Sequence, residues 1–225
     1  MIITEFDPLK GVFITTEGDV PLGNFFPVIL GKRHQLSRSF DPCTACRGKC
    51  LKDVKDCTEP HVVYIALFGD RLKIGVTKEK RLSCRLKEQG ADAGFSIAVV
   101  EDGERARILE QYYSRELGIP DRLSAEEIAM TMSDCSFSKI KPYIDQFKVR
   151  RIYTIRYKNS IRVKNPIRIV PRSGLKIGGN VLGNKGRIVV LSRGKISYWF
   201  SAEELVGYEA HPSEKFDAQT SLYEW

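Results

Sequence analysis

Four cysteines within 15 residues constrain this chain more than any other feature of its sequence. Cys43, Cys46, Cys50 and Cys57 follow the spacing C-x2-C-x3-C-x6-C, and the residues between them are mostly Lys, Arg, Gly, Asp and Thr. So polar a stretch cannot build a hydrophobic core of its own. In an intracellular setting, such clustering indicates that the thiolates bind a metal rather than form disulfides.

The four-cysteine ligand set limits which metals could bind. Four thiolates at short spacing suit a closed, tetrahedral structural zinc site, which we expect within residues 41–60. An iron–sulfur cluster accepts the same four ligands, and four reduced cysteines without metal are the simplest alternative. His34 and His61 flank the cluster, and either could replace one thiolate. For His61, a structural hydrogen bond is the favoured interpretation.

The charge of the chain is segregated along its length. The net charge is +8, from 36 Lys and Arg against 28 Asp and Glu. Residues 146–202 contain 14 of the basic residues and no acidic one, so the other 22 are outnumbered by acids elsewhere. Segregated positive charge is typical of proteins that bind a polyanion. No apolar run reaches 18 residues and the first ten residues hold no apolar leader, so we expect a cytoplasmic protein without a membrane partner.

The centre of the chain alternates strand and helix signals in the order ββαβα. Continuous or alternating apolar runs predict the strands, and apolar residues four apart predict the helices. Asp102 and the Ser124–Glu127 pair are N-cap signals, while Gly90 and Gly118 are stop signals. The strands are expected at residues 62–67, 72–76 and 97–101, and the helices at residues 80–89, 102–118 and 140–147.

This central segment, residues 61–148, resembles the core of the GIY-YIG endonucleases. The branch that it resembles most has K-I-G as its second motif. The residues that carry this resemblance are Val62-Val63-Tyr64, Lys73-Ile74-Gly75, Arg85 and Glu110. Residues 61–91, with Gln89-Gly90-Ala91, and residues 181–207, with Gly183-Asn184-Lys185-Gly186, further resemble a prokaryotic family of unknown function. That family joins cysteine-rich zinc modules to such a core.

The resemblance implies a role for each matched residue. Tyr64 would act as the general base or orient the attacking water, and Arg85 would stabilise charge on the phosphate. Glu110 would hold a divalent cation, Mg²⁺ or Mn²⁺. Lys73 stands where the family has a second tyrosine, and a lysine is a poor base unless it is desolvated. Gly75 would let the backbone approach the substrate.

From Ile152 onward the apolar period changes to two. Apolar residues up to Val163 alternate with cations, which predicts a strand pair with one apolar and one cationic face. Glycines punctuate further short strands up to Phe200, which indicates a small basic β-rich barrel or sandwich. Interleaved Tyr and Trp residues favour nucleic acid, RNA before DNA, as the partner. The cations expected to contact it are Arg151, Arg156, Lys158, Arg162, Lys164, Arg168, Arg172, Lys176, Lys185 and Arg187.

The sequence therefore predicts an α+β protein. Its parts are N-terminal strands (1–40), a cysteine metal module (41–60), a GIY-YIG-like domain (61–148), a basic β-rich domain (149–212) and a tail (213–225). The N- and C-terminal strands are candidates to pack together. The favoured function is nucleic-acid binding directed at RNA, and metal-dependent phosphodiester hydrolysis is a candidate activity that the sequence leaves open. The alternatives are a non-catalytic, zinc-containing RNA-binding protein associated with tRNA or the ribosome, and a zinc-stabilised module that binds an acidic protein.

Overall fold

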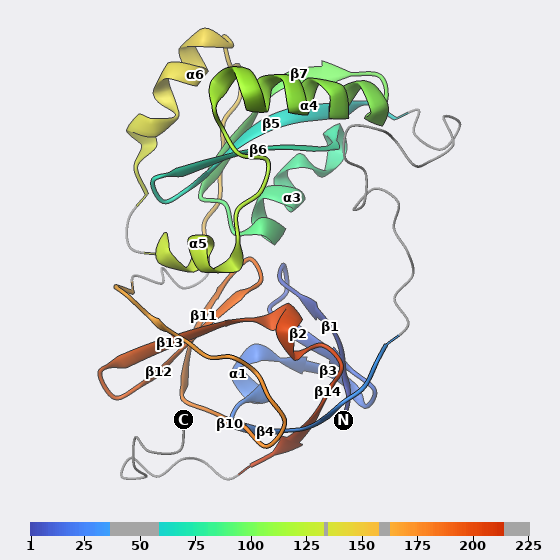
Figure 1. The fold of residues 1–225 in the computed structure, drawn as a ribbon, viewed down its shortest axis with the longest axis vertical. Helices are drawn as coiled ribbons and strands as arrows, with labels where there is room; N and C mark the ends of the chain where they lie inside the picture. Colours follow the sequence, from blue (N-terminus) through green and yellow to red (C-terminus); the bar gives the residue numbers. More distant parts are fainter. Residues whose placement is uncertain (37–58, 133–134, 158–162, 214–225) are drawn as a thin grey trace. The chain divides into compact units, whose positions relative to one another are not determined.

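The computed structural model describes residues 1–36, 59–132, 135–157 and 163–213. The chain divides into two compact units, which we treat separately (Figure 1). Unit 1 combines Met1–Ser37 with Tyr157–Trp225, and unit 2 is Arg38–Arg156. Both are built mainly of sheets with a few helices, which confirms the α+β prediction. Among the described residues, no helix is long and apolar enough to cross a bilayer.

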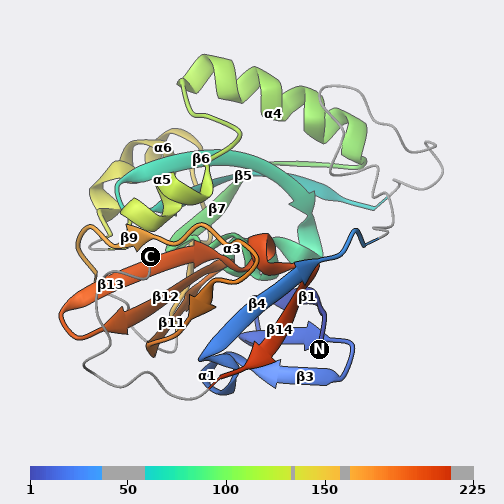
Figure 2. The same cartoon turned by 60° about the horizontal axis from the view of Figure 1, so that its bottom comes forward.

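Unit 1 joins strands from the two ends of the chain. Strand β4 (Val28–Arg33) lies between β10 (Lys176–Ile177) and β14 (Tyr208–Pro212), and it pairs antiparallel with both. Figure 2 shows β4 beside β14. Over the described ranges these strands belong to open sheets and not to a closed barrel. The remaining elements are β1 (Ile3–Asp7), β2 (Val12–Thr15), β3 (Gly18–Pro21), α1 (Leu22–Phe25), β9 (Ile167–Arg168), β11 (Asn180–Lys185), β12 (Ile188–Arg193), β13 (Ile196–Ser201) and η4 (Ala202–Leu205).

Aromatic side chains from both ends of the sequence fill the core of unit 1. Phe13 and Phe25 lie 4.2 Å apart between ring centroids, and Phe26 contacts Phe200 of β13 at 5.7 Å. Successive strand residues point to opposite faces, so Phe200 enters this core while Trp199 faces the other side of the sheet. Because the N-terminal strands and β13 share one core, neither can bury its apolar face without the other.

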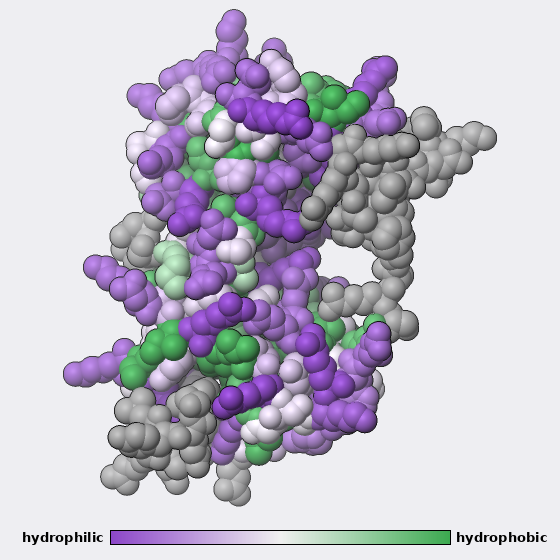
Figure 3. All heavy atoms as spheres, viewed as in Figure 1, coloured by the Kyte–Doolittle hydropathy of each residue, from purple (hydrophilic) through white to green (hydrophobic). Residues whose placement is uncertain are grey.

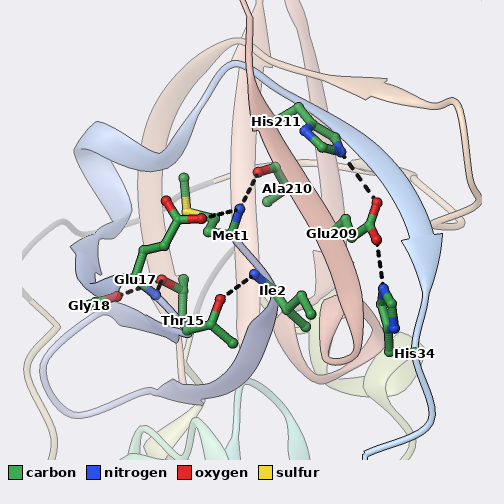
Figure 4. Close-up of polar contacts among 10 residues, drawn as sticks. Met1, Ile2, Thr15, Glu17, Gly18, His34, Glu209, Ala210 and His211 are labelled. Atoms are coloured by element: carbon green, nitrogen blue, oxygen red, sulfur yellow. Dashed lines mark hydrogen bonds and ion pairs between the residues drawn. The ribbon is translucent and has the colours of Figure 1, made fainter.

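A polar cluster fastens β14 to the N-terminal strands of unit 1 (Figure 4). Glu209 Oε1 lies 2.7 Å from His34 Nε2, and its Oε2 lies 3.5 Å from His211 Nε2. Both contacts hold the pKa of the Glu209 carboxyl below its usual value, the His34 hydrogen bond contributing most. Gly31 makes room for this carboxylate, because a Cβ at that position would lie 2.7 Å from Glu209 Oε2. The Met1 amino group binds Glu17 at 2.8 Å.

Unit 2 contains a four-stranded antiparallel sheet with the strand order β6-β5-β7-β8. The predicted ββαβα order is confirmed, although β7 begins at Ala93, four residues earlier than expected. The elements are β5 (His61–Phe68), β6 (Arg71–Lys78), η2 (Glu79–Arg81), α3 (Leu82–Gln89), β7 (Ala93–Val100), α4 (Gly103–Leu117), α5 (Ala125–Met130), η3 (Phe137–Lys139), α6 (Lys141–Gln146) and β8 (Tyr153–Thr154).

Strand β5 is buried on both faces because helices cover each of them. Tyr64 and Ala66 belong to the cluster that contains Leu86 of α3, whereas Val63 and Ile65 belong to the cluster packed against α4. Figure 1 shows α3 and α4 on opposite sides of this sheet. The continuous apolar run of β5 is thus explained by its position in the middle of a three-layer unit.

The predicted helix caps are confirmed. The Asp102 side chain accepts a hydrogen bond from Arg105 N at 2.8 Å, and Ser124 with Glu127 forms a complete capping box. Gly90 and Gly118 end α3 and α4 in the left-handed region, with φ of 86° and 63°. The backbone N–H group of each glycine donates to a carbonyl oxygen in the last turn of its helix, which would otherwise have no partner.

The predicted strand pair from Ile152 to Val163 is wrong over its described part. Only Tyr153–Thr154 form a strand, and β8 pairs with β7 of unit 2. Tyr153 and Ile155 pack against the apolar cluster on the α3 face. Their alternation with polar residues reflects an edge strand that buries one side, and residues 158–162 lie outside the described residues.

Candidate functional site

The sheet of unit 2 positions Tyr64 and Lys73 on one face. Tyr64 of β5 lies opposite Gly75 of β6, and Lys73 lies opposite Ala66, two residues along the same face. The Lys73 ammonium group lies 5.7 Å from the centroid of the Tyr64 ring. Antiparallel register therefore brings the two predicted residues together, although nine positions separate them in the sequence.

Gly75 provides the space for the Tyr64 ring. A Cβ at residue 75 would lie 2.5 Å from Tyr64 Oη and 2.6 Å from Cζ. The expectation that Gly75 lets the backbone approach a substrate is not what its contacts indicate. The glycine instead allows a fully buried tyrosine to lie flat across β6.

Gln89, the last residue of α3, connects the polar groups of this face. Its amide makes a 2.9 Å hydrogen bond with Tyr64 Oη, and Lys73 Nζ lies 3.5 Å from the same amide atom. Turned so that its oxygen faces Arg85, the amide also accepts from Nε and Nη2 at 3.1 and 3.2 Å. In this orientation the amide nitrogen donates to Tyr64 Oη while the amide oxygen accepts from the Arg85 guanidinium, so both groups have a hydrogen-bond partner. Sequence reasoning assigned Gln89 no role, because a glutamine before a helix stop carries no chemical signal.

The environment changes the pKa values of both Tyr64 and Lys73. Burial raises the pKa of Tyr64 to about 12, although the nearby Arg85 guanidinium and the Gln89 hydrogen bond act in the opposite direction. Burial, followed by repulsion from Arg85, lowers the pKa of Lys73 to about 8, while Glu110 and Asp121 oppose the change. At neutral pH the lysine loses its proton more readily than the tyrosine does.

Glu110 comes to the site from the opposite helix. It is a buried residue on α4, in line with Ala106 and Gly103, and its Oε2 accepts from Arg107 Nη1 at 2.8 Å. Within the described residues its Oε1 makes no hydrogen bond. The charge of Glu110 acts on both Tyr64 and Lys73, which places it within electrostatic reach of them. Strand β6 is an edge strand of the sheet, and residues of both α3 and α4 contact it.

Contacts with Gln89 therefore bring together Tyr64, Lys73 and Arg85, three residues named from the sequence. The fourth, Glu110, acts on Tyr64 and Lys73 through its charge. Arg85 also lies 3.4 Å from Glu88 Oε2 on the same helix. His61 has its Nδ1 2.6 Å from Glu59 O, a structural hydrogen bond. Where the structure describes the chain, no group of His, Cys, Asp and Glu is arranged to hold a metal. The predicted zinc ligands Cys43, Cys46, Cys50 and Cys57 lie outside the described residues.

The same residues fall within a known family model. A model described as "Protein of unknown function (DUF2797)" matches residues 34–209. The chain belongs to this family. The match includes the cysteine cluster, the site of unit 2 and the strands up to β14. No curated protein and no solved structure matches the chain.

The cations expected to bind nucleic acid do not form one free set in this DUF2797 protein. Arg168 and Arg187 make ion pairs with Glu204 and Glu203, and Lys185 is buried. Lys176 is partly buried, and Lys158 and Arg162 lie outside the described residues. Four remain exposed and make no ion pair with any described residue: Arg151, Arg156, Lys164 and Arg172.

Proposed function

We propose that unit 2 is a GIY-YIG-like catalytic domain and that the protein hydrolyses phosphodiester bonds in nucleic acid, RNA in preference to DNA. One observation carries the proposal. Four residues named from widely spaced motifs are coupled electrostatically, because the charges of Arg85 and Glu110 both act on Tyr64 and on Lys73. Two neighbouring groups with perturbed pKa values, here Tyr64 and Lys73, are a pattern that functional sites share.

Lys73 is the better candidate for the base. A general base near neutral pH requires a pKa close to the working pH, and the pKa of Lys73, about 8, meets this condition. The pKa of Tyr64, about 12, keeps its hydroxyl protonated. Tyr64 would then donate or accept a hydrogen bond that orients the attacking water, while the neutral Lys73 amine accepts the proton of that water.

Arg85 supplies positive charge for the phosphate. Its guanidinium is half-buried and is held by Glu88 and the Gln89 amide. A donor fixed before the reaction stabilises the developing charge without reorganisation, which is the most effective form of electrostatic catalysis. Losing one such donor lowers kcat by about a hundredfold or more.

Glu110 is the candidate ligand for a divalent cation, although the described residues hold no cluster of three or more His, Cys, Asp or Glu side chains. Glu110 keeps one carboxylate oxygen free of hydrogen bonds to described residues, and Asp121 is a second carboxylate within reach of Lys73. Mg²⁺ is commonly bound through one or two carboxylates, with water completing its coordination. Such a cation, when bound, would polarise a nonbridging phosphate oxygen.

The burial of Tyr64 favours a second candidate, a non-catalytic RNA-binding protein associated with tRNA or the ribosome. A side chain with 1% exposure makes no direct contact with a substrate in the described arrangement. In this account Tyr64 and Gln89 stiffen α3 against the sheet, and the fold presents Arg85 as a phosphate contact only.

A cleavage assay separates the two. Labelled RNA and DNA are incubated with the full chain and Mg²⁺ or Mn²⁺, beside Arg85→Ala, Glu110→Gln and Lys73→Met. Arg81→Ala is the matched control, because Arg81 also pairs with Glu88 but is more exposed. We expect Arg85→Ala to cut about a hundredfold more slowly and Arg81→Ala to cut normally. Tight binding without any cleavage by the unaltered chain would refute hydrolysis and support the second candidate.

A further inference from the structure

A small apolar hollow lies in unit 1. It is lined by β9, the turn after it and β13, and its volume is about 210 Å³. Sites for drug-sized ligands begin at about 300 Å³, so this hollow suits a single ring system. The residues that line it include Ile167, Arg168, Val170, Arg172, Leu175 and Tyr198.

Two aliphatic side chains at the hollow are unusually exposed. Ile167 is 54% and Val170 is 64% exposed, although both belong to a segment whose neighbour Ile169 is buried in the core. Figure 3 shows hydrophobic side chains gathered at the surface of unit 1 on the side where β13 lies. Single exposed aliphatic residues are ordinary, but two that border one hollow form a contact surface.

The charged residues of the hollow are all positive. Arg168 is fixed in place, because its Nη2 donates to Glu204 at 2.7 Å and its guanidinium lies 5.3 Å from the centroid of the Trp199 ring. Arg172 is exposed and makes no ion pair with any described residue. No carboxylate lines the hollow. Because Glu204 compensates the charge of Arg168, Arg172 supplies the uncompensated positive charge beside the apolar centre. This arrangement is complementary to a ligand that is flat, apolar and anionic at its margin.

We propose that this hollow receives one unpaired base of a single-stranded nucleic acid, with a neighbouring phosphate at Arg172. Single strands can turn a base outward into such a contact, whereas the bases of a duplex are stacked inside it. The inference rests on the proposed nucleic-acid binding but not on cleavage. Under this inference, unit 1 is the part of the protein that recognises single-stranded nucleic acid.

The test measures the affinity of a 12-nucleotide single-stranded RNA by fluorescence anisotropy. Every protein variant in this test also carries Glu110→Gln, so that the RNA probe is not cleaved. Ile167→Asp is compared with Ile108→Asp, because Ile108 of α4 has the same 54% exposure and the substitution adds the same charge. We expect Ile167→Asp to weaken binding about tenfold more than Ile108→Asp. Val170→Asp, outside any strand, repeats the test should Ile167→Asp fold poorly.

Three further arms make the outcome decisive. An abasic 12-mer keeps the phosphates, so the difference between Ile167→Asp and Ile108→Asp should vanish with it. Arg172→Ala should reduce the slope of log affinity against log salt by about 0.7. Equal weakening by the two isoleucine variants, or equal competition by an acidic peptide of matched charge, would overturn the base site alone. If the unaltered chain binds no strand at all, this inference and the proposed nucleic-acid binding fail together.

Discussion

Replacing Lys73 by Met should stabilise the protein at neutral pH, and the gain should depend on pH. The pKa of Lys73 falls from 10.5 to about 8 on folding, because burial and the Arg85 charge disfavour the ammonium form. Below pH 8 the lysine is protonated in both states, so the folded state carries the full penalty. Between pH 8 and 10.5 the folded state loses the proton first, and stability rises with pH.

The size of the effect follows from the two pKa values. Each unit of pKa difference corresponds to about 1.4 kcal/mol, so the charged lysine destabilises the fold by about 3 kcal/mol at pH 7. At pH 10 the remaining penalty is about 0.8 kcal/mol. The advantage of Lys73→Met over the unaltered chain should therefore shrink by about 2.5 kcal/mol from pH 7 to pH 10. Any constant difference in packing cancels in this comparison.

Urea unfolding of both chains at pH 7, 8.5 and 10, followed by circular dichroism, measures the difference. Lys141→Met is the control, since Lys141 of α6 is exposed and pairs with no described acid. Its effect should be small at every pH. An advantage of Lys73→Met that stays constant within about 0.5 kcal/mol across the three pH values would refute the reasoning. It would show that Lys73 is solvated, and its role as base would lose its physical ground.

The other predictions concern the site, the fold and the cysteines. The cleavage rate should rise about tenfold per pH unit below pH 8 and level off above it, and a flat profile would contradict Lys73 as the base. Gly75→Ala should lower the free energy of unfolding by about 1–3 kcal/mol through the clash with Tyr64, whereas Gly23→Ala, which meets no atom within 4 Å, should change it little. Ser124→Ala should reduce hydrogen-exchange protection of α5 by about 1 kcal/mol. Elemental analysis should find one zinc per chain, and Cys43→Ser should lose it.

The elements that were predicted correctly are those with local causes. Residues 62–67 form a strand buried on both faces, and such strands consist of continuous apolar residues wherever they occur. The Asp102 cap and the Ser124–Glu127 box depend on groups within one helical turn. Because no distant residue takes part in these two caps, the sequence alone was sufficient to place them.

The features that escaped prediction depend on contacts between distant segments. The alternation around Tyr153 and Ile155 indicated an extended chain with one buried side, but a period of two does not say which sheet covers that side. The role of Gly75 follows from Tyr64, which lies opposite it only because of the β5–β6 register. Register is set by the whole hairpin, so neither residue reveals the contact by itself.

The ion pairs of unit 1 were also not predictable from charge counted along the sequence. The acid-free stretch ends at Ala202, and the next two residues, Glu203 and Glu204, pair with Arg187 and Arg168. A count along the sequence therefore overstated the free positive charge, because it stopped just before the residues that neutralise part of it. The structure leaves Arg172 as the free cation beside the apolar hollow among the described residues.

Lys73 gives the strongest argument that the edge of β6 serves a function. A half-buried ammonium group is costly, and its described contacts offer little in return: a 3.5 Å approach to the Gln89 amide and a 5.7 Å approach to the Tyr64 ring. An apolar residue of the same length would pack there without that penalty. Positions where a fold keeps a destabilising residue are expected at functional sites, because the residue is retained for its chemistry and not for stability. In the phosphodiester hydrolysis that we propose, an amine with a pKa near 8, subject to the charges of Arg85 and Glu110, would be suited to accept a proton from water.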